Sequence, residues 1–182
     1  MKLPVAGARI IVAIVAPLLI ACTSHSDTDA GDYTGLMSFD TATIRLVGHN
    51  TVRLTVELAE SQAQQTMGLM ERRTLAPDAG MLFLYSSVQP ESSAFWMFRT
   101  RIPLDIAFID SVGTIKTVTT MRPCESELAQ GCPNYPANAR YIAALEANAG
   151  YFAKQGLAVG DRVLLGDTVA RRRAARSRPT ER

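Results

Sequence analysis

Alternation of apolar and polar side chains predicts a β-hairpin near the start of the main apolar region. Apolar residues recur at every second position over 44–46 and again over 52–56. This two-residue period is typical of strands that bury one face and leave the other in water. Gly48-His49-Asn50 lies between the two segments and has the composition of a turn. We therefore expect two adjacent antiparallel strands with one solvent-exposed face.

Three later segments are apolar at nearly every position and predict strands that are buried on both faces. They are 80–85, 94–98 and 106–109. A strand covered on both sides shows no polar alternation, as expected deep in a small barrel or sandwich. Further strands are predicted over 114–121, 141–145 and 162–165.

Two short helices are predicted between these strands. Ser61 and Gln64 have the spacing of a capping box, and the helix that they begin extends to about Met70. Asn148 is expected to cap a second helix, which ends at Gly156. The predicted fold class is therefore α+β, mainly β: a small mixed β-barrel or β-roll with two short helices.

The N-terminal segment has the form of a bacterial lipoprotein signal. Lys2 and Arg9 precede an apolar run over 10–20, which is too short to cross a bilayer as a mature helix. The run ends in Leu19-Ile20-Ala21-Cys22, which resembles the lipobox that directs acylation of the cysteine and cleavage before it. A plain secretory signal with an incidental cysteine is the alternative.

This signal predicts the organisation of the chain and its location. Two acyl chains on Cys22 would suffice for stable anchoring on the periplasmic side of a membrane. Thr23 follows Cys22 where inner-membrane lipoproteins typically carry Asp, so the outer membrane is favoured over the inner membrane. We expect a signal peptide over 1–21, an acylated flexible tether over 22–42, a single globular domain over 43–167 and a disordered Arg-rich tail over 168–182.

The two remaining cysteines are expected to form a disulfide. Cys124 and Cys132 have seven residues between them, and outside the cytoplasm such a pair is normally oxidised. A redox pair and two metal-ligating thiolates are the alternatives. Redox centres usually separate their cysteines by two residues, and a zinc site needs more ligands than this segment offers.

The distribution of charge argues against nucleic-acid binding. The formal net charge of +2 conceals a domain region, 22–170, with 11 basic and 16 acidic side chains. This mildly acidic body lacks a basic footprint for nucleic acid. The tail from Arg171 to Arg182 has six arginines and one acid; it is expected to be solvated, with contact to anionic lipid or glycan as the alternative.

Several motifs together resemble one known family, the domain-of-unknown-function 192 family. They are Gly68–Arg72, Gly80–Phe83, Phe95–Met97, Thr100–Asp105, Phe108–Asp110 and, near the end, Leu145-Glu146, Ala149-Gly150, Gly156-Leu157 and Val159–Asp161. The resemblance extends over roughly residues 43–166. It implies a small, mostly β fold and, as in many members, export or membrane association. Phe98-Arg99 departs from the Lys-Asn that members commonly carry, and no established reaction follows from the resemblance.

Few residues could support catalysis, a metal or a cofactor. His25 lies in the tether and His49 in a turn, so a histidine-based triad or a multi-histidine metal site is not expected. No Gly-rich phosphate-binding loop is present. The methionines at apolar positions, Met67, Met70, Met81 and Met97, are expected to fill the core rather than to bind copper. The sequence thus predicts neither a metal nor a cofactor.

Asp105 is the most informative polar residue, because it lies within an apolar strand. A carboxylate there must begin the strand at a rim or have a partner, and Arg72 is favoured over Arg99 and Arg101. One hypothesis is a structural clasp between Arg72 and Asp105. The other is a pocket that recognises a small polar ligand; its candidate residues are Arg72, Trp96, Met97, Arg99 and Asp105.

An enzyme is the alternative to a binding module. Asp105, Glu57 and Glu146 are weak catalytic candidates, since two carboxylates can cleave a glycan or an ester. The favoured function is non-catalytic: binding or accessory work by a lipid-anchored envelope protein. Its expected partners are the membrane through the anchor and an envelope glycan, a small polar ligand or an envelope protein, and not nucleic acid. A purely structural partner of another envelope protein is a further alternative.

Overall fold

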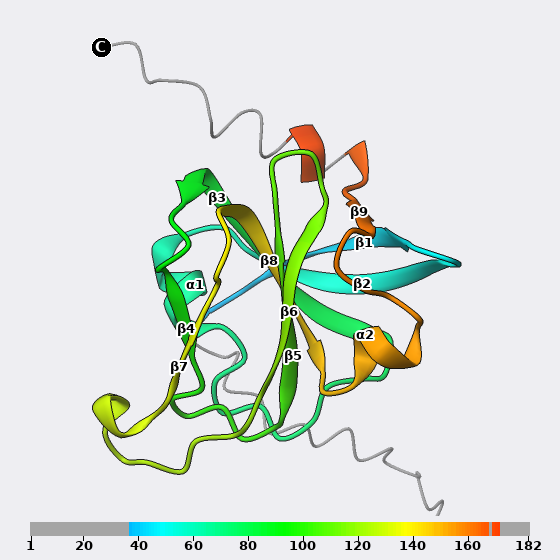
Figure 1. Ribbon diagram of the computed structural model, residues 1–182. Coiled ribbons are helices and arrows are strands. Elements are labelled where there is room, and N and C mark those ends of the chain that lie inside the picture. The colour runs from blue at the N-terminus through cyan, green and yellow to red at the C-terminus, as the bar shows by residue number, and fades with distance from the viewer. Residues whose placement is uncertain (1–36, 168, 172–182) are drawn as a thin grey trace, which may run out of the picture.

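The protein folds around a curled, seven-stranded half-barrel sheet (Figure 1). The computed structural model describes residues 37–167 and 169–171. The strands are β1 (Asp40–Val47), β2 (Thr51–Ala59), β3 (Ala79–Gln89), β4 (Ala94–Trp96), β5 (Leu104–Ile109), β6 (Ile115–Met121), β7 (Asn134–Pro136), β8 (Tyr141–Asn148) and β9 (Arg162–Leu164). The helices are α1 (Gln62–Met67), the 3-10 turn η2 (Ala129–Gly131) and α2 (Tyr151–Lys154). The predicted class, α+β and mainly β, is confirmed, with η2 as a third helical element beside the two expected helices.

The large sheet has the strand order β6-β5-β8-β3-β2-β1-β9. The predicted hairpin is present as β1 and β2, which pair from Asp40 with Leu58 to Val47 with Thr51. The β2–β3 pair is parallel, whereas every other neighbouring pair in this sheet is antiparallel. A parallel pair needs a crossover connection, and the crossover between β2 and β3 contains α1.

Both faces of the sheet are covered, as the continuous apolar runs predicted. On β5, Ala107 and Ile109 belong to a first core that has members from all seven strands and from α2. Leu104, Ile106 and Phe108 point the other way, into a second core. All six residues of β5 are buried. The second core is overlaid by α1, β4 and β7, which gather on one side of the sheet in Figure 1.

The prediction that segment 94–98 is a strand buried on both faces is wrong. The segment is not a strand deep in the barrel, because β4 pairs only with β7 in a separate two-stranded sheet. Phe95 packs toward the second core, while Trp96 points outward and is 42% exposed. The chain then turns, with the Thr100 N–H donating to the Met97 carbonyl. A short strand lying over a sheet can be as apolar as one within it, so composition alone does not separate the two.

The helix starts were predicted with mixed success. The capping box of α1 is confirmed, since the Gln64 N–H donates to Ser61 Oγ and the Ser61 N–H donates to Gln64 Oε1. The predicted cap of α2, Asn148, is wrong, because Gly150 holds the N-cap position in a left-handed conformation. Asn148 ends β8 instead, and its amide donates to the carbonyls of Leu75 and Ala76.

The ordered domain extends beyond both expected boundaries. β1 begins at Asp40, within the expected tether, and Val169 is buried in the first core, within the expected tail. The signal 1–21, the acylation site Cys22 and most of the tether and tail lie outside the described residues. Among the helices that the structure describes, none has the length and apolar character to cross a membrane.

Candidate functional site

A cavity of about 370 Å³ lies on the outer side of the second core. Its lining comes from α1 and the turn after it, β3, β4, β7 and β8. One wall is aromatic and comprises Phe83, Tyr85, Phe95, Trp96 and Tyr141. The polar lining includes Gln65, Thr66, Gln89, Ser93, Thr100 and Asn134. A concave, largely aromatic site with a few polar groups is the usual form of a small-molecule pocket.

Glu146 brings a carboxyl group to this cavity from the middle of the sheet. On β8 it lies opposite Met81 of β3 and Ile106 of β5, and it is only 4% exposed. Within the part of the chain that the structure describes, no side chain donates a hydrogen bond to it. Burial raises the pKa of Glu146 from its ordinary value of 4.5 to about 8, because desolvation disfavours the charged form. At neutral pH this carboxyl is therefore mainly protonated.

Two tyrosines line the same cavity and contact each other, and Tyr85 interacts with the Glu146 carboxyl. The rings of Tyr85 and Tyr141 meet edge to face with 5.4 Å between centroids. Burial, and after it the neighbouring Tyr141 and Glu146, raises the pKa of the Tyr85 hydroxyl. Burial also raises the pKa of Tyr141, against hydrogen bonds with Tyr85 and Ser93 that lower it. Both hydroxyls remain neutral and available as hydrogen-bond groups at physiological pH.

The aromatic wall is held by a series of edge-to-face ring contacts that continue into the second core. Phe95 meets Phe83 at 5.0 Å and Phe108 at 5.5 Å between ring centroids, both edge to face. Phe108 in turn contacts Tyr141 at 4.9 Å. Such contacts stabilise a fixed ring arrangement beyond simple burial. The cavity wall is thus positioned by β3, β4, β5 and β8 together.

The opposite wall depends on α1 and on a glycine. Gln65 Nε2 donates to the Leu84 carbonyl at 2.8 Å, which ties α1 to β3. Gly68 ends the helix with a φ of 50°, where a side chain would be strained. This sharp turn lets residues 68–70 return over the cavity.

The structure distributes the predicted ligand-binding residues over several places. Of the five candidates, only Trp96 lines the cavity. Met97 is fully buried in the second core. Asp105 accepts a hydrogen bond from Thr120 Oγ1 at 2.7 Å. The predicted Arg72–Asp105 contact is wrong, because Arg72 Nη2 lies 2.6 Å from Glu57 Oε2.

Arg99 lies in a separate, polar hollow beside the cysteine pair. Glu71 and Arg99 both adopt left-handed backbone conformations, with φ of 61° and 56°. The Glu71 N–H donates to the Arg99 carbonyl at 2.7 Å, and the Glu71 carboxylate pairs with Arg99 and Arg101. These contacts hold two turns that would otherwise be strained. The arginine that was predicted to contact a ligand thus has a structural partner.

The three carboxylates of the enzyme hypothesis are not brought together. Asp105 shares the face of Ala107 and Ile109, which is the face opposite to Glu146. Glu57 lies on the Glu146 face but two strands away, with Met81 between them, which places the two Cα atoms roughly 10 Å apart. Glu57 is also paired with Arg72 and does not line the cavity. Glu146 is the one acidic side chain in the described lining.

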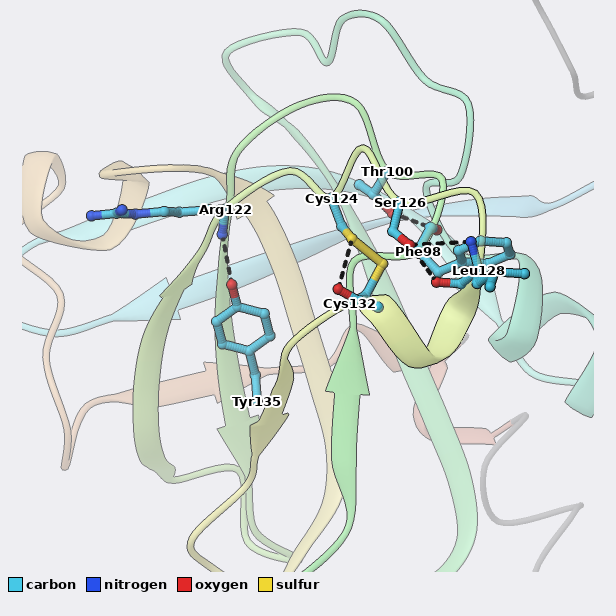
Figure 2. Close-up of a disulfide and its surroundings, with 9 residues drawn as sticks. Phe98, Thr100, Arg122, Cys124, Ser126, Leu128, Cys132 and Tyr135 are labelled. Atoms are coloured by element: carbon cyan, nitrogen blue, oxygen red, sulfur yellow. Dashed lines mark hydrogen bonds between the residues drawn. A yellow bond between two sulfur atoms is a disulfide. The ribbon is translucent and has the colours of Figure 1, made fainter.

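Cys124 and Cys132 lie at disulfide distance, with 2.08 Å between the sulfur atoms and 5.7 Å between the Cα atoms. Figure 2 shows the bond next to residues 98–100 and the η2 turn. Phe98 forms an isolated parallel bridge with Cys124, and β7 begins two residues after Cys132. In the same region Tyr135 Oη accepts a hydrogen bond from the Arg122 N–H at 3.1 Å. The cysteine pair therefore closes the loop before β7, and the Phe98–Cys124 bridge places this loop beside the segment that follows β4.

Within residues 37–167 and 169–171, no group of three or more His, Cys, Asp or Glu side chains is placed to hold a metal ion.

Comparison with known proteins identifies the family. The sequence profile of the DUF192 family, described as an uncharacterised ACR, matches residues 43–165. The chain belongs to the DUF192 family. No curated protein matches it.

Two solved structures are similar to this DUF192 chain. A Sinorhizobium meliloti protein described as a candidate transcription regulator is 37% identical, with a TM-score of 0.60 over 69% of this chain and 94% of that chain. A Novosphingobium aromaticivorans protein of unknown function is 29% identical, with a TM-score of 0.62 over 71% of this chain and 89% of that chain. The DUF192 assignment and these structures agree on the fold, and neither supplies a reaction.

Most of the cavity lining was not predicted from the sequence. Tyr85 and Tyr141 stand near the middle of β3 and at the start of β8, in segments that were assigned to the core. A tyrosine at the edge of an apolar run is the signal that could have found them, since its hydroxyl needs a polar partner. Glu146 was identified as a weak catalytic candidate together with Glu57 and Asp105. The tyrosines that share its cavity were not identified.

Proposed function

We propose that this protein is a lipid-anchored envelope protein that binds a small molecule, without catalysis, in the cavity between α1 and β4. The observation that carries the binding proposal is Glu146, a buried carboxyl group that faces an aromatic cavity. A buried ionisable group without a protein partner costs free energy, so its presence at a cavity favours a functional role over a structural one.

The envelope location rests on the sequence of the leader. The lipobox-like Leu19–Cys22 segment and the pair Cys124 and Cys132 both suit a protein exported to an oxidising compartment. The expected anchor is an acylated Cys22 on the periplasmic side, with the outer membrane favoured. The cavity would then face periplasmic small molecules or fragments of envelope glycan.

A hydrolase is less well supported by the geometry. Glycan cleavage by two carboxylates needs both groups on one cleft, and Glu146 is accompanied there by tyrosines rather than by a second acid. A purely structural partner role gives no reason for a buried carboxyl at a cavity. Binding is therefore the function that we infer.

Ligand-observed NMR on the purified full-length chain tests this proposal. A library of small amines, alcohols, sugars and acids is screened against the wild type and two variants. Ala94→Trp places a bulky ring at an exposed residue of the cavity lining. Ala153→Trp makes the same change at an exposed position on α2, which lies outside the lining. Near-UV circular dichroism checks that both variants retain the fold.

We expect at least one compound whose NMR binding signal is lost with the Ala94→Trp protein and retained with the Ala153→Trp protein. Compounds that bind all three proteins equally lie elsewhere on the molecule. A library with no compound sensitive to Ala94→Trp would refute small-molecule binding at this cavity.

A further inference from the structure

The charged groups around the cavity are all potential anions. The described lining contains no Arg, Lys or His, and its titratable side chains are Glu146, Tyr85 and Tyr141. An anionic ligand would face a carboxyl and two phenols without a cation to pair with. Anions are therefore poor candidates for this site.

We propose that the cavity selects a ligand that carries an organic cation, with the cationic group on the Glu146 carboxylate and against the aromatic rings. This inference rests on the proposed function and adds the chemical class of the ligand. A carboxylate in a buried site needs an opposite charge or several donors, and the described protein supplies neither to Glu146. In the free protein the group is mainly protonated, so a cationic ligand would supply the opposite charge that stabilises its ionised form.

The aromatic lining suits the same class of ligand. Ring faces attract ammonium groups, and desolvated sites strengthen the attraction. Phe83, Phe95 and Tyr141 line the cavity, as does the partly exposed Trp96 of β4. Cages of a carboxylate and several rings recognise alkylated or primary ammonium groups in this way. A cavity of about 370 Å³ holds a small amine with room for a further polar part.

Binding of a cation should displace a proton from Glu146. The carboxyl is protonated at neutral pH because burial raises its pKa to about 8, and an ammonium group stabilises the ionised form. The other titratable groups in the described lining are Tyr85 of β3, which interacts with Glu146, and Tyr141 of β8, and both stay neutral in this range. Affinity for a cation should therefore rise about tenfold per pH unit below 8 and level off above it. A neutral ligand that uses the protonated carboxyl as donor would show the opposite trend.

Isothermal titration calorimetry on the full-length chain separates these cases with matched probes. Choline is compared with 3,3-dimethylbutan-1-ol, which has the same shape without the charge, and benzylamine with benzyl alcohol. The proteins are the wild type, Glu146→Gln and Asp105→Asn. Asp105 is a buried acidic residue on the opposite face of the sheet, so its variant controls for loss of a buried acid away from the cavity.

We expect at least one cation to bind ten times more tightly than its neutral counterpart, with release of nearly one proton at pH 7. This preference should disappear in Glu146→Gln and persist in Asp105→Asn. Equal or tighter binding of the neutral probes would overturn the cation assignment while leaving small-molecule binding intact. The cation assignment also fails if no probe binds while other compounds remain sensitive to Ala94→Trp. If no compound of any class is sensitive to that variant, the proposed function fails as well.

Discussion

At the scale of single residues, Glu146 shows how strand alternation creates a site. Its neighbours on β8, Leu145 and Ala147, point into the first core, so Glu146 must point to the other face. There its cross-strand neighbours are Met81 and Ile106, which give it no polar contact. The opening at the cavity is what allows a carboxyl at this position. A polar residue in an apolar strand thus marks the place where the core is incomplete.

The raised pKa of Glu146 predicts a pH dependence of stability. The unfolded carboxyl loses its proton near pH 4.5, whereas the folded one retains it until about pH 8. The contribution of Glu146 to stability is therefore full below pH 4.5 and is lost as the pH rises through 8, by an amount on the order of a few kcal/mol. Glu146→Gln removes this ionisation, so its stability relative to the wild type should increase between pH 5 and pH 8.5.

Urea unfolding of both proteins at the two pH values measures this difference. Asp105→Asn serves as the control, because Asp105 has a hydrogen-bond partner in Thr120. If the gap between wild type and Glu146→Gln stays constant with pH, the carboxyl is not protonated in the folded state.

At the scale of elements, the cysteine pair stabilises the small sheet that covers the second core. β4 and β7 are three residues each and pair only with each other. An isolated two-stranded sheet of this length is marginal by itself. The cysteine pair closes the loop before β7, and the Phe98–Cys124 bridge joins this loop to the segment after β4. One wall of the cavity therefore depends on a covalent link outside it.

Loss of this link should lower stability and loosen the cavity. The two cysteines are eight positions apart, and closing so short a loop contributes about 2–3 kcal/mol. We expect Cys124→Ser/Cys132→Ser to lose stability by about this amount in urea unfolding. Addition of a reductant should destabilise the wild type similarly and leave the double variant unchanged. An equal response of both proteins to the reductant would show that no disulfide stabilises this region.

At the scale of the whole molecule, the proposed leader and the domain would make independent contributions. The domain provides a covered half-barrel with an aromatic cavity on its outer side. The leader, through Cys22, would decide which small molecules reach that cavity, since an anchored periplasmic domain does not meet cytosolic substrates. The acidic body of the chain, with a net charge of −5 over 22–170, also favours cations over anions at a distance.

Anchoring predicts that Cys22 carries the lipid. Metabolic labelling with a palmitate analogue should mark the wild-type protein in the membrane fraction, because acyl chains on the first residue give stable attachment. Cys22→Ser should abolish the label, and the chain should no longer be held in membranes by acyl groups. Cys124→Ser/Cys132→Ser is the matched control and should keep the label. If the Cys22→Ser protein is still labelled, the acyl group is on another residue and Cys22 is not the anchor.

The secondary structure was largely predictable because it depends on local patterns. Period-two alternation identified β1 and β2, and the capping box identified the start of α1. The apolar runs correctly indicated β3 and β5 as covered on both faces. The run at 94–98 was misassigned because a strand that lies over a sheet can be as apolar as a strand inside the sheet. Composition alone does not separate the two cases. Asn148 was misassigned because its amide is used by a loop 73 positions away.

The candidate site shows the limit of the sequence more sharply. By itself the sequence indicated Glu146 as a weak catalytic candidate, Trp96 as a ligand-binding candidate and Cys124 and Cys132 as a disulfide pair, since each is an unusual residue for its local pattern. It could not determine that Glu146 shares a cavity with Tyr85 and Tyr141 or that Arg72 pairs with Glu57 instead of Asp105. Those partners come from strand order and register, which bring together residues far apart in the chain. Local pattern decided which face each residue takes, and only tertiary packing decided what it meets there.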